Sequence, residues 1–335
     1  MRSTKSPSWI KRALGFSPLP VPPHVFDLAE RRLRYGQFVR AGGGRGGGYR
    51  FRAYRAVPLP PDAFMAGPLG GPLRDPRAFQ TLVAGLVKEL PGVREASLVI
   101  PDAWLRVTFA DSTELPRAAA ARDDVLRWKL KRLVPFRVDE LRIGAQEVEP
   151  LPNQPADEPR RLLLGFAVDQ LLVQIEDAFA AAGVRLGEIT NTSLALISAL
   201  GEEGPTPEFW ALVLVEETGY TLAFVHGSEP VLLRFKAFTG TVPEAARASL
   251  VSRDLKLTKN FLDEHFPGAD LARVLLAAPE ALEPIWLDRL SDGLGTPAAP
   301  LGAAHLPPLQ MDVALGQPIW REVAPMLGAA RLEVL

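Results

Sequence analysis

Residues 122–150, RDDVLRWKLKRLVPFRVDELRIGAQEVEP, hold a helix, a stop and a strand in succession. Three leucines recur at helical spacing and predict one apolar helix face: Leu126, Leu130 and Leu133. Pro135 then ends the helix, because its ring prevents continuation and disfavours helical geometry at Val134. Apolar residues between positions 141 and 148 predict the strand. The stretch contains no catalytic or ligand-binding motif, but its pattern helps to indicate the fold.

The composition is that of a globular protein. A length of 335 residues predicts about two domains, and 47% hydrophobic with 23% charged residues allows a large core. The net charge of −1 gives no global attraction to nucleic acid or anionic lipid. The chain has no cysteine, which excludes disulfides and thiol chemistry and fits a reducing compartment. No run approaches the roughly 20 apolar residues of a membrane span, and residues 1–23 are expected to be a flexible, basic and proline-rich tail.

Hydrophobic patterning predicts two α/β halves. Each half opens with three successive strands, at 24–29, 32–40 and 49–57 in the first and at 209–217, 220–227 and 229–238 in the second. Each then alternates helices with strands, which predicts a weak internal duplication. The apolar runs 96–101 and 104–110 are expected to form a β-hairpin or adjacent strands.

Simple catalytic motifs are absent or weak. Gly42, Gly44 and Gly47 match GxGxxG, but the match is nearly automatic in a tract of six glycines, and a strand-like segment follows where a helix is required. The sequence has no P-loop and no GxSxG elbow. The four histidines are scattered, so no metal site is predicted.

The strands between positions 32 and 57 alternate arginine with aromatic residues. Such a stretch can bind a protein partner along an edge strand, or nucleic acid through its arginines. Alternatively, the arginines form a solvated face and the aromatic rings belong to the core. The candidate partner-binding residues are Arg34, Tyr35, Phe38, Tyr49, Phe51 and Tyr54.

The stretch quoted first resembles a known family. Residues 125–148 resemble the PilM family of type IV pilus assembly proteins, in which an acid-flanked helix ends in an aromatic-rich Pro-Phe before an acidic turn and a strand. Residues 161–200, 212–238 and 311–319 follow the family's element order, so the resemblance covers most of residues 24–325. The cytoplasmic part of GspL, from type II secretion, is a relative with a similar pattern.

The resemblance implies an α/β, actin-like (ribonuclease-H-like) fold of two lobes, with a small α+β subdomain inserted in the first lobe. The expected division assigns the first lobe to 24–92 and 186–205, the inserted subdomain to 93–185, the second lobe to 206–310, and a C-terminal helix packing back on the first lobe to 311–335.

The family commonly binds ATP in the cleft between its lobes, and the matching turns here depart from its pattern. In the first turn Asp27 is retained, but Ala29 replaces a glycine and Glu30 replaces a hydroxyl residue. In the second turn Glu216 stands where an aspartate–glycine pattern is usual, although a turn shifted to Thr218 and Gly219 is an alternative. The third turn contains Ala277, Ala278 and Pro279 in place of glycines.

These departures predict a vestigial nucleotide cleft and no enzymatic activity, with no cofactor and with ATP and magnesium disfavoured. The expected function is a cytoplasmic scaffold, peripheral to the inner membrane, that binds the N-terminal tail of a PilN-like membrane protein and other pilus or secretion platform proteins. Two alternatives remain: a working actin-like ATPase of the same machinery, and a nucleic-acid-binding α/β protein that uses the arginine-rich strands.

Overall fold

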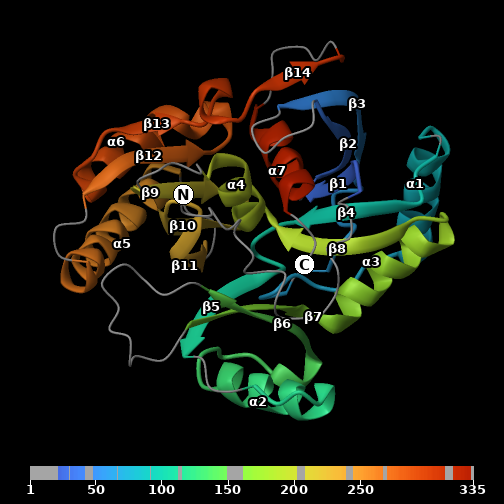
Figure 1. Ribbon diagram of the computed structural model, residues 1–335, viewed down its shortest axis with the longest axis horizontal. Helices are drawn as coiled ribbons and strands as arrows, with labels where there is room; N and C mark the ends of the chain where they lie inside the picture. Colours follow the sequence, from blue (N-terminus) through green and yellow to red (C-terminus); the bar gives the residue numbers. More distant parts are fainter. Residues whose placement is uncertain are drawn as a thin grey trace, which may run out of the picture.

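The computed structural model describes residues 22–29, 31–41, 48–65, 67–90, 92–111, 115–148, 161–201, 208–238, 244–266, 270–313 and 320–332. Two lobes lie side by side, and a smaller subdomain projects from them (Figure 1). Most of the expected N-terminal tail, Glu30 and the glycines at 42–47 lie outside the described residues.

The first lobe is built on a six-stranded sheet in the order β14-β3-β2-β1-β4-β8. Strands β1 to β3 form an antiparallel meander, whereas β4 and β8 run parallel to β1. The strands are β1 (His24–Ala29), β2 (Arg32–Arg40), β3 (Tyr49–Pro58), β4 (Glu95–Ile100), β8 (Arg185–Asn191) and β14 (Leu309–Met311). Helices α1 (Pro76–Lys88) and α3 (Asp169–Ala181) cover one face, and α7 (Trp320–Arg331) covers the other.

The second lobe has a five-stranded sheet in the order β11-β10-β9-β12-β13. Its strands are β9 (Phe209–Val215), β10 (Gly219–His226), β11 (Glu229–Ala237), β12 (Leu271–Ala277) and β13 (Ala298–Pro300). Helices α5 (Glu244–His265) and α6 (Glu283–Leu294) pack on one face. The short 3-10 turns η3 (Glu280–Leu282) and η4 (Ala303–His305) connect the last elements.

Helix α4 (Thr192–Leu200) lies between the lobes, as Figure 1 shows. Ala195 packs with the core of the first lobe, and Leu196 packs with the core of the second. Helix α7 crosses α4 closely at Gly328, where an added Cβ would lie 1.7 Å from the carbonyl oxygen of Ala195. Only a glycine fits such a crossing, so this position fixes how the C-terminal helix joins the two lobes.

The projecting subdomain is a three-stranded sheet, β5-β7-β6, with one helix on its face. Its elements are β5 (Arg106–Asp111), α2 (Ala119–Lys131), η2 (Val138–Glu140), β6 (Leu141–Val148) and β7 (Arg161–Val168). Leu126 and Leu130 of α2 pack on the sheet, as their spacing predicted. Leu133 follows the last helical residue and is 48% exposed, which corrects its expected place on the buried face.

The expected boundaries of the subdomain need correction. Strand β4 lies between β1 and β8 in the large sheet, so 96–101 and 104–110 do not form a hairpin. Helix α3 buries its apolar face in the core of the first lobe, so the insertion spans about 106–168 instead of 93–185. The second lobe also ends before the expected position 310, because β14 starts at Leu309 and pairs with β3 of the first lobe. These errors share one cause: parallel strands pair with partners far away in the sequence.

Candidate functional site

A cavity of about 530 Å³ lies between the two lobes. The carboxyl ends of β1, β9 and β12 reach it from the two sheets, and α4 and α7 contribute its remaining walls. Ligands of open α/β sheets bind at such carboxyl ends. Of the expected nucleotide residues, the structure brings together Asp27, Ala29, Glu216, Ala277 and Ala278 around this cavity.

The first turn is occupied by a buried ion pair. Asp27 is 3% exposed and accepts a hydrogen bond of 2.8 Å from Nη1 of Arg34, its direct partner across the β1–β2 hairpin. Nη2 of Arg34 lies 3.5 Å from Glu322 of α7, which also accepts a 2.6 Å hydrogen bond from the Tyr54 hydroxyl. Burial raises the pKa of Asp27, and the Arg34 guanidinium opposes that shift. The retained aspartate is thus engaged by a cation of the protein itself.

An ion pair also crosses the mouth of the cavity. Arg31, in the turn between β1 and β2, donates a 2.8 Å hydrogen bond from Nε to Glu217, and a second contact joins the same two groups. Glu217 lies in the turn after β9. The pair therefore links the first and second expected phosphate turns, one from each lobe.

The second turn is closed on itself. The Glu216 N–H donates to the carbonyl of Gly219, and the Phe238 N–H donates to the carbonyl of Thr218, both at 2.9 Å. A Cβ at Gly219 would lie 2.4 Å from the carbonyl oxygen of Lys236, so glycine is needed there for the approach of β11. Thr218 and Gly219 are not among the residues that line the cavity. A phosphate turn shifted to these two residues is therefore not favoured by the geometry.

The third turn provides an apolar wall. Ala277, Ala278 and Pro279 line the cavity, and the proline has no N–H to donate to a ligand. Beside them Arg321 of α7 forms a 2.5 Å ion pair with Glu283 of α6, a second link between the lobes.

Together, these groups give the cavity a lining of paired charges. The cavity is lined by four carboxylates and four arginines, and carboxylates pair with Arg31, Arg34 and Arg321. Phosphate sites instead rely on free backbone N–H groups and uncompensated cations. Within the described ranges, no group of three or more His, Cys, Asp or Glu residues could hold a metal ion.

Sequence reasoning missed a buried carboxylate between the lobes. Asp102 is 1% exposed and accepts hydrogen bonds from the Ser193 N–H at 2.9 Å and from the Thr221 hydroxyl at 2.5 Å. Ser193 lies in the first turn of α4, whereas Thr221 belongs to β10 of the second lobe. Burial raises the pKa of Asp102, and these hydrogen bonds oppose that shift. Asp102 thus joins the two lobes through a contact between residues distant in the sequence, which local sequence patterns do not predict.

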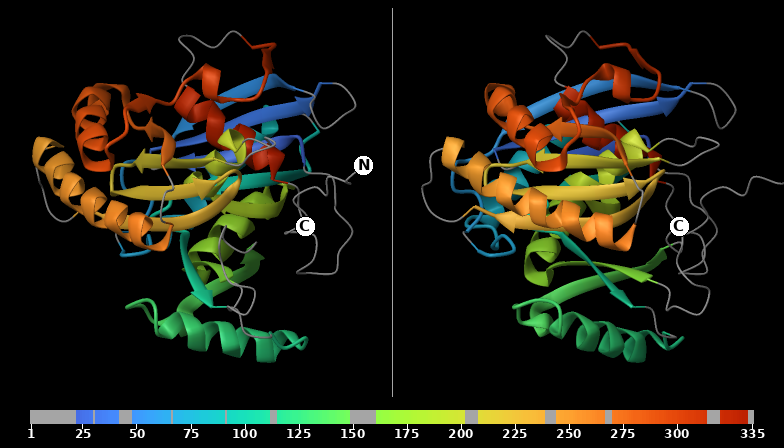
Figure 2. Two further views of the ribbon diagram at one scale, coloured as in Figure 1. Left: turned by 60° about the vertical axis from the view of Figure 1, so that its left-hand side comes forward. Right: turned by 90° about the vertical axis from the view of Figure 1, so that its left-hand side faces the viewer.

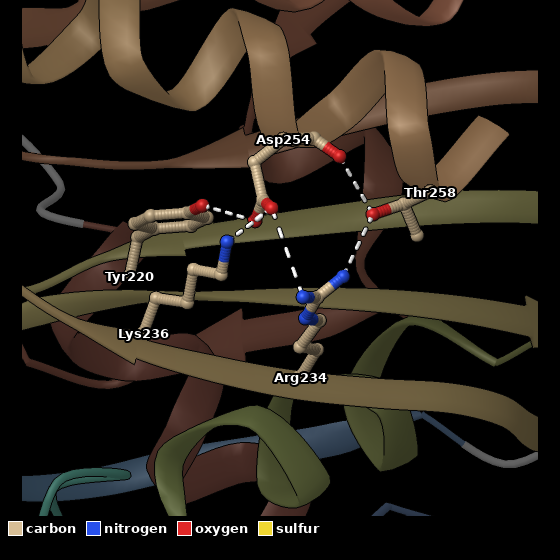
Figure 3. Close-up of polar contacts among 5 residues, drawn as sticks. All are labelled: Tyr220, Arg234, Lys236, Asp254 and Thr258. Carbon is tan, nitrogen blue, oxygen red and sulfur yellow. Dashed lines mark hydrogen bonds and ion pairs between the residues drawn. The ribbon is translucent and has the colours of Figure 1, made fainter.

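A second polar cluster, also missed, holds α5 on its sheet (Figure 3). The buried Asp254 accepts a 2.6 Å hydrogen bond from the Tyr220 hydroxyl and pairs with Lys236 of β11. Arg234 lies 3.8 Å from the same carboxylate and donates to the Thr258 hydroxyl. Lys236 and Arg234 hold the pKa of Asp254 below its usual value, despite its burial. The cluster stabilises the packing of α5 against edge strand β11.

The candidate partner-binding residues lie elsewhere than expected. Tyr35, Phe38, Tyr49 and Phe51 are buried in the core of the first lobe, and Arg34 faces the cavity. The alternation along these strands therefore reflects a core face of aromatic rings and an opposite face of arginines. Buried rings cannot stack on bases or meet a partner, so these four rings are unavailable for binding, whereas the partly buried Tyr54 donates to Glu322.

The two lobes, the cleft between them and the inserted subdomain define an actin-like fold. No family model and no curated protein matches the sequence. Among solved structures, a chain of the "PilM-PilN type IV pilus biogenesis complex" superposes with a TM-score of 0.71 and 15% identity, over 95% of this chain and 100% of that one. This likeness confirms the expected actin-like fold in its PilM-like form.

Two other solved structures align with lower scores. The cytoplasmic domain of EpsL, an inner membrane component of the type II secretion system of Vibrio cholerae, aligns at a TM-score of 0.45 and 9% identity, over 92% of this chain and 93% of that one. A Bacteroides thetaiotaomicron protein with an actin-like ATPase fold aligns at a TM-score of 0.44 and 7% identity, over 84% of this chain and 91% of that one. In the part of the chain that the structure describes, no helix is long and apolar enough to cross a membrane.

Proposed function

We propose that this chain is a cytoplasmic assembly scaffold of a type IV pilus, or of a related secretion machine, peripheral to the inner membrane. The sequence resemblance of residues 125–148 to the PilM family and the shared fold both support this function. The solved complex pairs PilM with PilN. By extension, this chain binds the N-terminal tail of a PilN-like membrane protein.

The non-enzymatic part of the proposal rests on one observation, the ion pair between Arg31 and Glu217. It occupies the place where two phosphate turns would approach a nucleotide from opposite lobes. A triphosphate would have to displace Glu217 or accept its charge at short range, which is electrostatically unfavourable. We therefore propose a degenerate nucleotide cleft whose lobes are held together by the protein's own side chains.

The partner is tested by co-expression with a PilN-like membrane protein that has a short cytoplasmic tail and a single membrane span. We expect the two proteins to co-elute in detergent, and we expect the complex to disappear when the cytoplasmic tail of the membrane protein is deleted. Failure of two folded, full-length proteins to associate would overturn the scaffold assignment.

A working ATP-binding protein is the second candidate, because a cavity of about 530 Å³ does lie between the lobes. The variant Glu30→Ser restores the hydroxyl that the PilM family has in its first turn. A gain of ATP binding in this variant points to a pocket lost through that turn alone, whereas no change points to a wider loss.

A further inference from the structure

The helix of the inserted subdomain presents an exposed tryptophan. Leu126 and Leu130 face the sheet beneath α2, and Trp128 lies midway between them, on the opposite side of the helix. Trp128 is 59% exposed and shares the highest exposure among the large hydrophobic side chains of the described residues. Its ring contributes little to the core, so packing alone does not account for a tryptophan at this position.

Basic and apolar side chains adjoin this ring. The Arg132 guanidinium lies over the indole, 5.5 Å from its centroid, and Leu133 is 48% exposed just beyond the end of the helix. Lys131 is exposed on the same part of the helix. We call Trp128, Lys131, Arg132 and Leu133 the α2 outer patch.

The positive charge of the patch is not neutralised within the described chain. Neighbouring arginines have acidic partners: Arg127 pairs with Asp123 at 2.7 Å, and Arg137 pairs with Glu140 at 2.8 Å. Lys131 and Arg132, by contrast, have no carboxylate within ion-pair distance among the residues that the structure describes. The exposed Asp124, one turn before Trp128, lowers the local charge from +2 to +1 by simple count.

The patch lies at an extremity of the molecule. Helix α2 forms the end of the subdomain farthest from both lobes in Figure 1, and both views of Figure 2 show it projecting in the same way. An extended flat surface could therefore contact α2 without touching either lobe.

We propose that the α2 outer patch contacts an anionic lipid bilayer. Tryptophan favours the interface between headgroups and acyl chains, because its ring is apolar and its indole N–H is polar. Lysine and arginine beside it are attracted to anionic headgroups, and the exposed Leu133 adds apolar area. The charge and the amphipathic ring, at a projecting end of the molecule, together fit the flat surface of an anionic bilayer. The contact requires neither the nucleotide cleft nor the membrane partner.

Vesicle flotation of the full chain tests this contact. We expect binding to vesicles that contain phosphatidylglycerol, and weaker binding to phosphatidylcholine alone. Trp128→Ala is expected to lower the apparent affinity about fivefold, and Lys131→Glu with Arg132→Glu about tenfold or more. Asp124→Lys is expected to raise it severalfold. Leu257→Ala removes an equally exposed side chain from the second lobe and is expected to leave binding unchanged.

A position-specific readout accompanies the affinities. Brominated lipids are expected to quench Trp128 fluorescence, measured as the difference between the wild-type chain and Trp128→Phe. All substituted side chains are exposed, so circular dichroism and melting temperature should match the wild type. The proposal is overturned if the wild-type chain does not bind anionic vesicles. It is also overturned if all variants bind them equally, which is the result expected when the basic N-terminal residues alone make the contact. Capture of an acidic protein through Trp128, without vesicle binding, would overturn it as well.

Discussion

Arg31 and Glu217 lie on opposite lobes, 186 residues apart in the sequence, and their side chains meet at 2.8 Å across the mouth of the cleft. Both side chains are largely exposed, at 76% and 51%. An exposed ion pair contributes only about 0–1 kcal/mol, so this pair adds to the buried links between the lobes, such as the Asp102–Thr221 hydrogen bond, and does not set their position alone.

Reversing one charge of this pair is predicted to open the cleft. The chain has no cysteine, so Arg52→Cys and Arg289→Cys place spin labels on exposed positions of the two lobes without background labelling. Arg31→Glu should lengthen or broaden the distance distribution, and Arg31→Glu with Glu217→Arg should restore it. Identical distributions in all three proteins would show that the pair does not position the lobes.

The Asp27–Arg34 pair is predicted to matter for stability, because both side chains are largely buried. Arg34→Ala leaves a buried carboxylate without its cation and should lower the free energy of unfolding by about 3 kcal/mol. Burial raises the pKa of Asp27, and losing Arg34 should raise it further. An acid whose folded-state pKa is raised loses stability as pH rises, so the deficit should be larger at neutral pH than under acidic conditions.

Urea unfolding at two pH values measures this deficit. The exposed Arg55, which pairs loosely with Glu89 at 3.9 Å, provides the matched control. Its replacement by alanine should cost less than about 1 kcal/mol. Equal costs at the two positions would contradict the structural role of the Asp27–Arg34 pair.

The order of the helices and strands could be predicted from hydrophobic periodicity, because burial of one face leaves a local signature. The pairing of β4 with β1 and β8 could not, since parallel partners are set by distant segments. Residue alternation offered Arg34 as a partner-binding or a solvated residue, yet the β1–β2 hairpin aligns Arg34 with Asp27. The hairpin register could therefore have predicted the Asp27–Arg34 pair from the sequence. No sequence pattern could have predicted the hydrogen bond between Asp102 and Thr221, because only the packed lobes bring these two side chains together.

Two helical glycines offer a matched pair for the packing of α7. Gly328→Ala places a Cβ 1.7 Å from the Ala195 carbonyl oxygen and should destabilise the protein by about 3 kcal/mol or more. Gly85→Ala, in α1, meets nothing within 4 Å and should stabilise it by about 0.5–1 kcal/mol through helix propensity. Thermal unfolding of both variants measures the difference. Shifts of the same sign would show that α7 does not cross α4 this closely.

Glu188 of β8 is predicted to make stability depend on pH. Burial raises its pKa to about 8, and its Oε2 has no hydrogen-bond partner among the described residues. The folded chain holds the proton that the unfolded chain releases, so stability falls as pH rises from the ordinary carboxyl pKa of 4.5 to about 8. Glu188→Gln should remove this fall and add about 1–3 kcal/mol at alkaline pH. Parallel stability–pH curves for the two proteins would contradict the burial of an uncompensated carboxyl group.

Calorimetric titration of the wild-type chain with Mg-ATP tests the degenerate cleft most directly. The ion pairs across the cavity predict no binding heat up to millimolar nucleotide, in the wild-type chain and in the Arg31→Glu, Glu217→Arg double variant alike. Saturable micromolar binding by the wild-type chain would contradict the account and identify a working nucleotide site.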